Sequence, residues 1–143
     1  MNSDSKQPAQ QGVNEFHWPV RVYYEDTDGG GVVYHANYLK FMERARTEWL
    51  RSLGFEQTEL RSRDGILFVV HDIEMQFRKP ARFNDELVVK SSLLKVGRSL
   101  LQFRQVIVCG DVCMTEATVD VVCIDAERFR PVSIPANIRQ SIS

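Results

Sequence analysis

The sequence predicts an α+β fold in which an antiparallel sheet wraps around a long central helix. A helix-like pattern occupies residues 37–53, and four strand-like segments joined by short connections follow it. Consecutive strands joined this tightly are antiparallel. Their alternation leaves one apolar sheet face, which the apolar side of the helix must cover.

The composition is that of one folded domain. The chain has 143 residues, with 18 Lys plus Arg against 19 Asp plus Glu, so it can bury a core without metal or disulfide staples. This charge balance gives no general attraction to nucleic acid or to a membrane surface, and any bound phosphate must be met locally. We expect residues 1–14, which are polar, to form a flexible tail and residues 15–143 to form a single domain.

Three cysteines, Cys109, Cys113 and Cys123, show no CxxC spacing and lie in or beside apolar strand-like runs. Such cysteines commonly act as small hydrophobic side chains, so we expect buried free thiols. The chain shows no apolar run typical of a signal peptide or a membrane span. The expected location is cytoplasmic, with no stable membrane insertion.

The first expected strand covers residues 20–24, where Val20, Val22 and Tyr24 alternate with Arg21 and Tyr23. The long helix follows at residues 37–53, and Gly54 ends it. Its apolar residues recur at spacings of three and four: Tyr38, Phe41, Met42, Ala45, Trp49, Leu50 and Leu53. A second short helix is expected at residues 57–63.

The four later strands are expected at residues 66–78, 86–96, 99–108 and 112–125. Pro80, with Ala81, should break or bulge the first of them, because proline cannot donate a ladder hydrogen bond. One strand, one long helix and four antiparallel strands together indicate a hotdog fold.

Between the first strand and the long helix, two carboxylates, Asp26 and Asp28, stand directly ahead of three glycines, His35 and the helix start. A glycine run feeding a helix start leaves backbone N–H groups pointing outward, where the helix dipole favours negative charge. Those donors can hold a developing oxyanion while a carboxylate attacks, or activates water to attack, the same carbon.

The segment YEDTDGGGVVYHANYLKFMERARTEWL closely resembles the signature of the 4-hydroxybenzoyl-CoA thioesterase family of hotdog proteins. Within that family the match is nearest to the Tol-Pal-associated acyl-CoA thioesterases of the YbgC type. FRKPARFNDELVV and GRSLLQF are looser matches. The resemblance implies hydrolysis of an acyl-CoA thioester to a carboxylic acid and CoA, without a cofactor. It also implies a homodimer with its central helices side by side under a continuous sheet, often paired into a homotetramer, and active sites at the dimer interface.

The resemblance also assigns site residues. The second aspartate of the D-x-D pair is the family's catalytic carboxylate and falls on Asp28, as nucleophile or general base. The carbonyl-polarising backbone N–H falls on His35. Substrate binding is expected at Tyr24, Gly31, Val32, Asn37, Arg98 and Ser99. Gly29 departs from the alanine or proline of close relatives, which softens the loop without removing a reacting group.

Arg98 is placed at the position where the family uses a basic residue to meet coenzyme A phosphates. A lone surface arginine is usually only solvated. Arg78, Lys79 and Arg82 can serve the same purpose or can keep an edge strand soluble.

Plainer interpretations stand beside these assignments. Asp28 can simply cap its turn, and Asp26 is expected to have a supporting or structural role. The His35 ring can line the pocket, assist proton transfer or be held by local hydrogen bonds. Asn37 reads equally as a first-turn polar group, and Tyr38 as a core residue. The helix residues Glu43, Arg46 and Glu48 are expected in a solvated or interface-facing stripe.

No histidine, cysteine or carboxylate forms a familiar zinc spacing with His35, so no metal is expected. Two other functions stay open. The domain can be a noncatalytic module that binds acyl-CoA or an acyl carrier protein, or a scaffold. It can also be a hotdog hydratase or dehydratase, which typically uses an Asp-His or Glu-His pair across a double bond.

Overall fold

The computed structural model describes residues 15–142, and the predicted tail at residues 1–14 lies outside them. The elements follow in the order β1 (Glu15–Arg21), the 3-10 turn η1 (Tyr24–Asp26), α1 (His35–Ser52), α2 (Gln57–Glu59), the π-helical turn η2 (Leu60–Asp64), β2 (Ile66–Phe77), β3 (Glu86–Val96), β4 (Leu100–Cys109), β5 (Val112–Asp125) and α3 (Ala136–Ile142).

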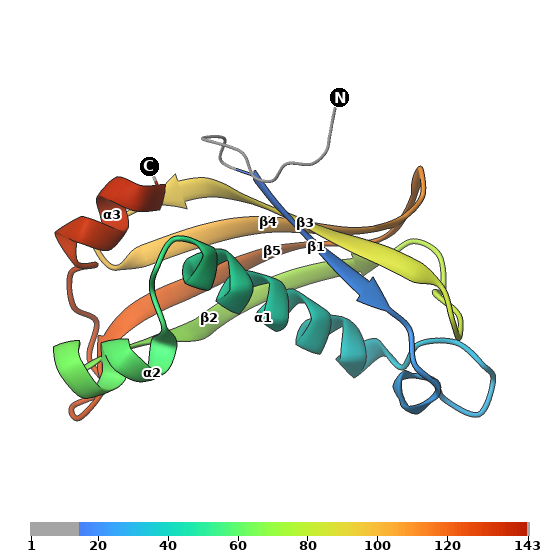
Figure 1. Cartoon of the computed structure of the whole chain (residues 1–143), viewed down its shortest axis with the longest axis horizontal. Coiled ribbons are helices and arrows are strands. Elements are labelled where there is room, and N and C mark those ends of the chain that lie inside the picture. Colours follow the sequence, from blue (N-terminus) through green and yellow to red (C-terminus); the bar gives the residue numbers. More distant parts are fainter. Residues whose placement is uncertain (1–14, 143) are drawn as a thin grey trace.

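The five strands form one sheet in the order β1-β3-β4-β5-β2, and every neighbouring pair is antiparallel. Helix α1 crosses one face of this curved sheet, and the short α3 lies at the end where β3 finishes (Figure 1). The predicted α+β arrangement of a sheet wrapped around a long helix is therefore confirmed. Both β1 and β2 are edge strands.

Most predicted elements occur close to their expected bounds, and β3 and β5 match them fully. The expected strand at residues 20–24 is wrong, because β1 begins at Glu15 and ends at Arg21, opposite Glu86. After Val22 the chain turns away, and Tyr24 is 79% exposed in η1. The sequence analysis also missed α3, whose Ile138 and Ile142 are buried.

The core lies between α1 and the concave face of the sheet. Its helix side consists of Tyr38, Phe41, Met42, Ala45, Trp49 and Leu50. Trp49 stacks on Phe16 of β1 with ring centroids 6.0 Å apart, and it meets Phe103 of β4 edge-on. Burying each large apolar side chain contributes roughly 1.5–3 kcal/mol, so this packing fixes how α1 lies on the sheet.

The stripe on α1 was expected to be solvated or to face an interface, and within one chain it is not fully solvated at Arg46. Arg46 is half-buried, and its guanidinium donates to Gln105 Oε1 at 2.9 Å. Gln105 is fully buried on β4 and donates in turn to the Met42 carbonyl and to Ser91 Oγ. Burial lowers the pKa of Arg46, while the nearby Glu43 carboxylate partly offsets this effect.

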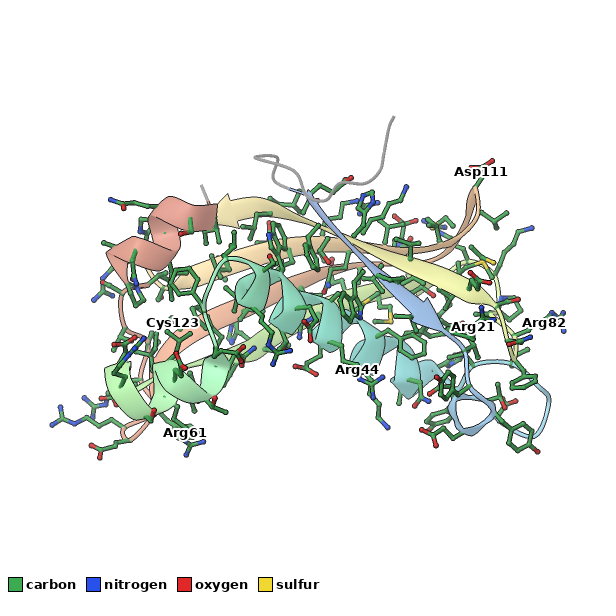
Figure 2. All side chains as sticks on the ribbon, viewed as in Figure 1. Arg21, Arg44, Arg61, Arg82, Asp111 and Cys123 are labelled. Carbon is green, nitrogen blue, oxygen red and sulfur yellow. The ribbon has the colours of Figure 1, made fainter. Side chains whose placement is uncertain are left out.

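All three cysteines are free, but only Cys123 is buried. Cys109 and Cys113 are half-buried because they flank the β4–β5 turn, whose tip carries Asp111 beyond the body of the sheet (Figure 2). The expectation of buried thiols is thus right only for Cys123. Within residues 15–142, no helix is both long and apolar enough to cross a membrane.

Candidate active site

The acidic glycine turn between β1 and α1 is closed by its own hydrogen bonds. The Asp28 amide donates to the Val32 carbonyl at 2.8 Å, and the Gly31 amide donates to the Asp28 carbonyl at 3.1 Å. Asp28 Oδ1 accepts from the Gly30 amide at 2.8 Å. Gly31 has φ of 83°, a left-handed conformation that glycine adopts without the penalty of a Cβ.

Asp26 ties this turn to the helix. Its Oδ2 accepts from the Tyr23 amide at 2.9 Å, and its Oδ1 accepts from Asn37 Nδ2 at 3.1 Å. Its carbonyl accepts from the Tyr34 amide at 2.9 Å. Asp26 therefore has the contacts of a supporting residue. Asn37 is buried and donates one of its side-chain N–H groups to Asp26.

The glycines do not feed α1 directly, contrary to the expectation from sequence. Val32, Val33 and Tyr34 intervene, and the Val33 amide donates to the Ala81 carbonyl at 2.8 Å. Helix α1 begins at His35, with Tyr34 as its N-cap. Among residues 15–142 the His35 main-chain N–H has no hydrogen-bond acceptor. This donor and the Ala36 N–H, which also has no acceptor within those residues, lie at the positive end of the helix.

A cleft of about 170 Å³ opens beside His35. Its walls are Val32, Val33, His35, Tyr38, Phe77, Arg78, Lys79 and Pro80. The His35 ring stacks on Phe77 with centroids 4.3 Å apart and planes 19° apart. Tyr38 also packs against Phe77, and its hydroxyl accepts from the Ala81 amide at 3.1 Å. The cleft thus joins the start of α1 to the end of β2.

Only some of the expected site residues meet at this cleft. Val32 and His35 line it. Asp28 is exposed and is not among the lining residues; its amide donates to the carbonyl of Val32, which is. Asn37 and Gly31 lie next to the lining residues in the chain but are not among them. Tyr24 is also outside the lining, where it packs edge-on against Phe83 with centroids 6.0 Å apart.

Arg98 and Ser99 lie at the opposite end of the molecule. They follow β3, whose eleven residues span roughly 35 Å at about 3.3 Å per residue. The first residue of β3, Glu86, pairs with Arg21, close to the loop that carries Asp28. Figure 1 shows the end of β3 and the loop before α1 at opposite ends. One chain therefore does not bring Arg98 and Asp28 together.

Phe77 was not predicted as a cleft residue, because it ends the alternating run Ile73, Met75 and Phe77, a pattern that indicates a buried sheet face. Phe77 is 47% exposed. The available signal was its place at the last strand position before two basic residues and Pro80, where the chain leaves the sheet. Within the part of the chain that the structure describes, no three His, Cys, Asp or Glu side chains gather as a metal site.

Residues 30–113, more than half of the chain, match the thioesterase superfamily. The acyl-CoA thioesterase YbgC of Haemophilus influenzae is 42% identical over 126 residues, which cover 88% of this chain and 93% of that protein. The acyl-CoA thioester hydrolase YbgC of Escherichia coli O6:H1 is 43% identical over 124 residues, covering 86% and 92%.

Solved structures agree with these relatives. A probable thioesterase from Bartonella henselae has a TM-score of 0.81 and 36% identity, covering 85% of this chain and 99% of that one. A 4-hydroxybenzoyl CoA thioesterase has a TM-score of 0.84, covering 92% and 100%, and its 20% identity bears on the fold alone. The predicted hotdog fold and family are confirmed, and the chain is an enzyme that belongs to the thioesterase superfamily.

Proposed function

We propose that this chain hydrolyses acyl-CoA thioesters to a carboxylic acid and CoA. The observation that carries the proposal is the N–H of His35, which has no hydrogen-bond acceptor within residues 15–142 and belongs to a residue that lines a cleft at the positive end of an 18-residue helix. A thioester oxygen held there gains negative charge during attack, and both the donor and the helix dipole stabilise that charge. The names of the similar YbgC proteins support the substrate class.

Asp28 supplies the reacting carboxylate in this proposal. Its Oδ1 is held by the Gly30 amide, while Oδ2 has no hydrogen-bond partner within residues 15–142. As a nucleophile, Asp28 adds to the thioester carbon and expels the CoA thiolate, and water then opens the mixed anhydride. As a general base, it takes a proton from water that attacks the same carbon. A thiol pKa of about 8.5 makes the thiolate a good leaving group without strong acid assistance.

The test is release of free thiol from a panel of acyl-CoA substrates by the parent chain and by Asp28→Asn. Asparagine keeps an oxygen that accepts from the Gly30 amide but removes the charge, so the fold should persist. We expect kcat to fall at least about 100-fold. A variant that turns over at the parent rate would remove Asp28 from the mechanism.

Asp26→Asn is the matched control. It changes the same residue type two positions away and weakens the bonds to Tyr23 and Asn37, so it should lower thermal stability more than kcat. A single turnover in ¹⁸O-labelled water tests for the anhydride. Label incorporated into the Asp28 carboxylate shows that water opened an anhydride at the Asp28 carbonyl, whereas label confined to the product acid shows that water attacked the acyl carbon, which happens by direct attack or by opening the anhydride at that carbon.

One observation favours a second candidate, a noncatalytic module that binds acyl-CoA or an acyl carrier protein, or acts as a scaffold. Asp28 is exposed and accepts a hydrogen bond inside its own turn, as a residue that only caps the turn would. Binding of acyl-CoA with no thiol release across the panel would support this module and contradict the hydrolase.

We also propose a homodimer with the two α1 helices side by side under a continuous sheet, paired again into a homotetramer. Edge strand β2 has twelve residues and exposes Val70 and Phe77, as an edge that pairs with a second copy would. A second copy is also the source from which Arg98 and Ser99 could reach a site. A solution mass measurement tests this assembly.

The cellular setting is likewise a proposal. We infer a cytoplasmic enzyme connected with the Tol-Pal system, with acyl carrier protein thioesters as additional substrates, from its likeness to the YbgC proteins. Thiol release from acyl carrier protein thioesters, compared with acyl-CoA thioesters of the same chain, tests the last point.

A further inference from the structure

Tyr38 is a core residue that also lines the candidate cleft. Only 2% of it is exposed, and it forms part of the cleft wall together with His35. Its ring meets Phe41 edge-on, with centroids 6.2 Å apart, and lies tilted against Phe77, with centroids 5.6 Å apart. These aromatic contacts fix the ring and therefore the position of its hydroxyl.

The protein uses the Tyr38 hydroxyl only as an acceptor. It accepts from the Ala81 amide at 3.1 Å, and this is its one hydrogen bond within residues 15–142. A phenol oxygen can accept a hydrogen bond and can also donate its own proton. The proton of Tyr38 therefore has no acceptor in the described part of the chain. Burying a donor without an acceptor costs free energy, so a partner for this proton is expected outside these residues.

The segment that faces the hydroxyl is held in place. The Ala81 carbonyl accepts from the Val33 amide at 2.8 Å, while the Ala81 amide donates to Tyr38. Ala81 is fully buried, and its neighbour Pro80 lines the cleft. Figure 1 shows the start of α1 and the connection between β2 and β3 at the same end of the molecule. The hydroxyl therefore lies where this connection meets α1, beside the cleft wall.

Tyr38 and His35 border the same volume. They are three residues apart on α1, a spacing that places two side chains on one face of a helix. A long side chain on a helix leans over the preceding turn, which here begins at His35. The cleft, at about 170 Å³, is smaller than the roughly 300–1,000 Å³ of pockets that hold whole drug-sized ligands. A group bound in so small a cleft lies close to both residues.

We propose that the Tyr38 hydroxyl donates a hydrogen bond to the thioester carbonyl oxygen of the substrate, beside the His35 N–H. The proposal rests on the proposed hydrolase function, since it adds a second donor to the same oxygen. That oxygen gains negative charge during attack, so the added hydrogen bond stabilises the transition state more than the bound substrate. The proton stays on the phenol throughout, and no covalent bond forms or breaks at Tyr38.

The first test uses two CoA analogues that cannot be hydrolysed. One is a ketone in which a methylene replaces the thioester sulfur, so the carbonyl oxygen keeps its place. The other is an S-alkyl-CoA thioether of the same chain length, which lacks that oxygen. Calorimetry of Tyr38→Phe should show binding of the ketone weakened about three- to tenfold, the effect of one hydrogen bond, and binding of the thioether unchanged.

Turnover provides the second test. Tyr38→Phe keeps the ring and its aromatic contacts, and we expect kcat/KM for an acyl-CoA to fall about 10- to 100-fold, mostly through kcat. Tyr34→Phe is the matched control. Tyr34 is 59% exposed and is not among the residues that line the cleft, so loss of its hydroxyl should leave turnover and binding unchanged.

A purely structural role for the hydroxyl, as acceptor for Ala81, gives different results. Tyr38→Phe removes that acceptor as well, so its melting temperature should fall under either role. A structural role predicts equal weakening for the ketone and the thioether, which would overturn the proposal. 4-Aminophenylalanine at position 38 restores a donor but is a poor acceptor for the Ala81 amide. Recovery of ketone binding in that variant supports donation to the substrate, and its absence counts against it.

The unreactive analogues keep this test separate from the hydrolase proposal. A parent chain that releases no thiol, together with selective loss of ketone binding in Tyr38→Phe, contradicts hydrolysis and supports the Tyr38 donor. A parent chain that hydrolyses acyl-CoA, with kcat and ketone affinity both unchanged in Tyr38→Phe, supports hydrolysis and overturns the donor.

Discussion

The Arg46 guanidinium donates to Gln105 Oε1 at 2.9 Å across the boundary between α1 and β4. Gln105 uses both of its side-chain N–H groups on Met42 and Ser91, so its oxygen must face Arg46. The Gln105 side chain therefore provides the acceptor for the Arg46 guanidinium on a sheet face that is otherwise apolar. No carboxylate lies within 4.0 Å of Arg46 in the described chain.

Loss of Gln105 should cost more while Arg46 is present than after Arg46 has been replaced. Gln105→Ala removes the acceptor of a half-buried guanidinium and leaves two further polar groups unsatisfied, so we expect a loss of about 3 kcal/mol in the free energy of unfolding. Arg46→Met removes the charge and keeps the apolar stem but leaves Gln105 Oε1 without a donor, so it should cost about 1–2 kcal/mol, less than Gln105→Ala. Urea unfolding of both single variants and the double variant measures the coupling, and simple additivity would contradict it.

The main-chain N–H of His35 can be removed without disturbing the helix. His35 is the first residue of α1, where proline is well tolerated, and Tyr34 before it has φ of −65° and ψ of 136°, which proline permits. We expect His35→Pro to keep the melting temperature within a few degrees and to lower kcat by about 100-fold or more.

His35→Ala is the partner of that experiment. It removes the ring that stacks on Phe77 but keeps the backbone donor, so kcat should fall less than about tenfold. Near-total inactivation by His35→Ala would show that the imidazole itself takes part. Equal activity of the proline and alanine variants would remove the backbone donor from the mechanism.

The two outer glycines of the turn should respond oppositely to alanine. A Cβ at Gly29 meets nothing within 4 Å, and its φ is not positive, so Gly29→Ala should raise the free energy of unfolding by about 0.4–1 kcal/mol. Gly31 has φ of 83°, where a Cβ is strained, so Gly31→Ala should lower it by about 1–2 kcal/mol. Thermal melts of the two variants are a direct comparison, and shifts of the same sign would contradict it.

Cys123 should make stability depend on pH in alkaline solution. Burial raises the pKa of its thiol from 9.0 to about 11, while the unfolded chain ionises near 9.0. The stabilisation is complete below pH 9.0 and is lost as the pH rises from there to about 11, because only the unfolded state releases its proton in that window. Urea unfolding at both ends of the window should show a smaller decline for Cys123→Ala than for the parent chain.

Sequence periodicity and the turns between strands together predicted most of the elements. Strands β3 and β5 were placed fully although their burial alternates along only part of their length, and α1 was placed to within two residues. The start of β1 was missed, although Phe16 and Trp18 alternate with exposed neighbours along the strand. Helix α3 is short, and only its packing on the core distinguishes it from a loop.

The sequence predicted which segment of the chain carries the candidate site, but not which side chains contact one another there. The sequence motif located His35 at the start of α1, but it could not show that Asn37 donates to Asp26. That contact is decided by how the 3-10 turn folds back on the helix. The cleft wall at Phe77 depends on where β2 ends relative to α1, which is a property of the packed sheet.

The last helix is joined to a distant turn by a single side chain. Arg139 donates to the carbonyls of Gly97 and Arg98, at 2.8 and 3.0 Å, while Ile138 and Ile142 close one end of the core. Removing residues 136–143 would therefore affect the structure beyond the loss of α3 itself. It would open a water-accessible gap over the sheet and release a hairpin some forty positions upstream, so shortened versions for crystallisation should retain α3.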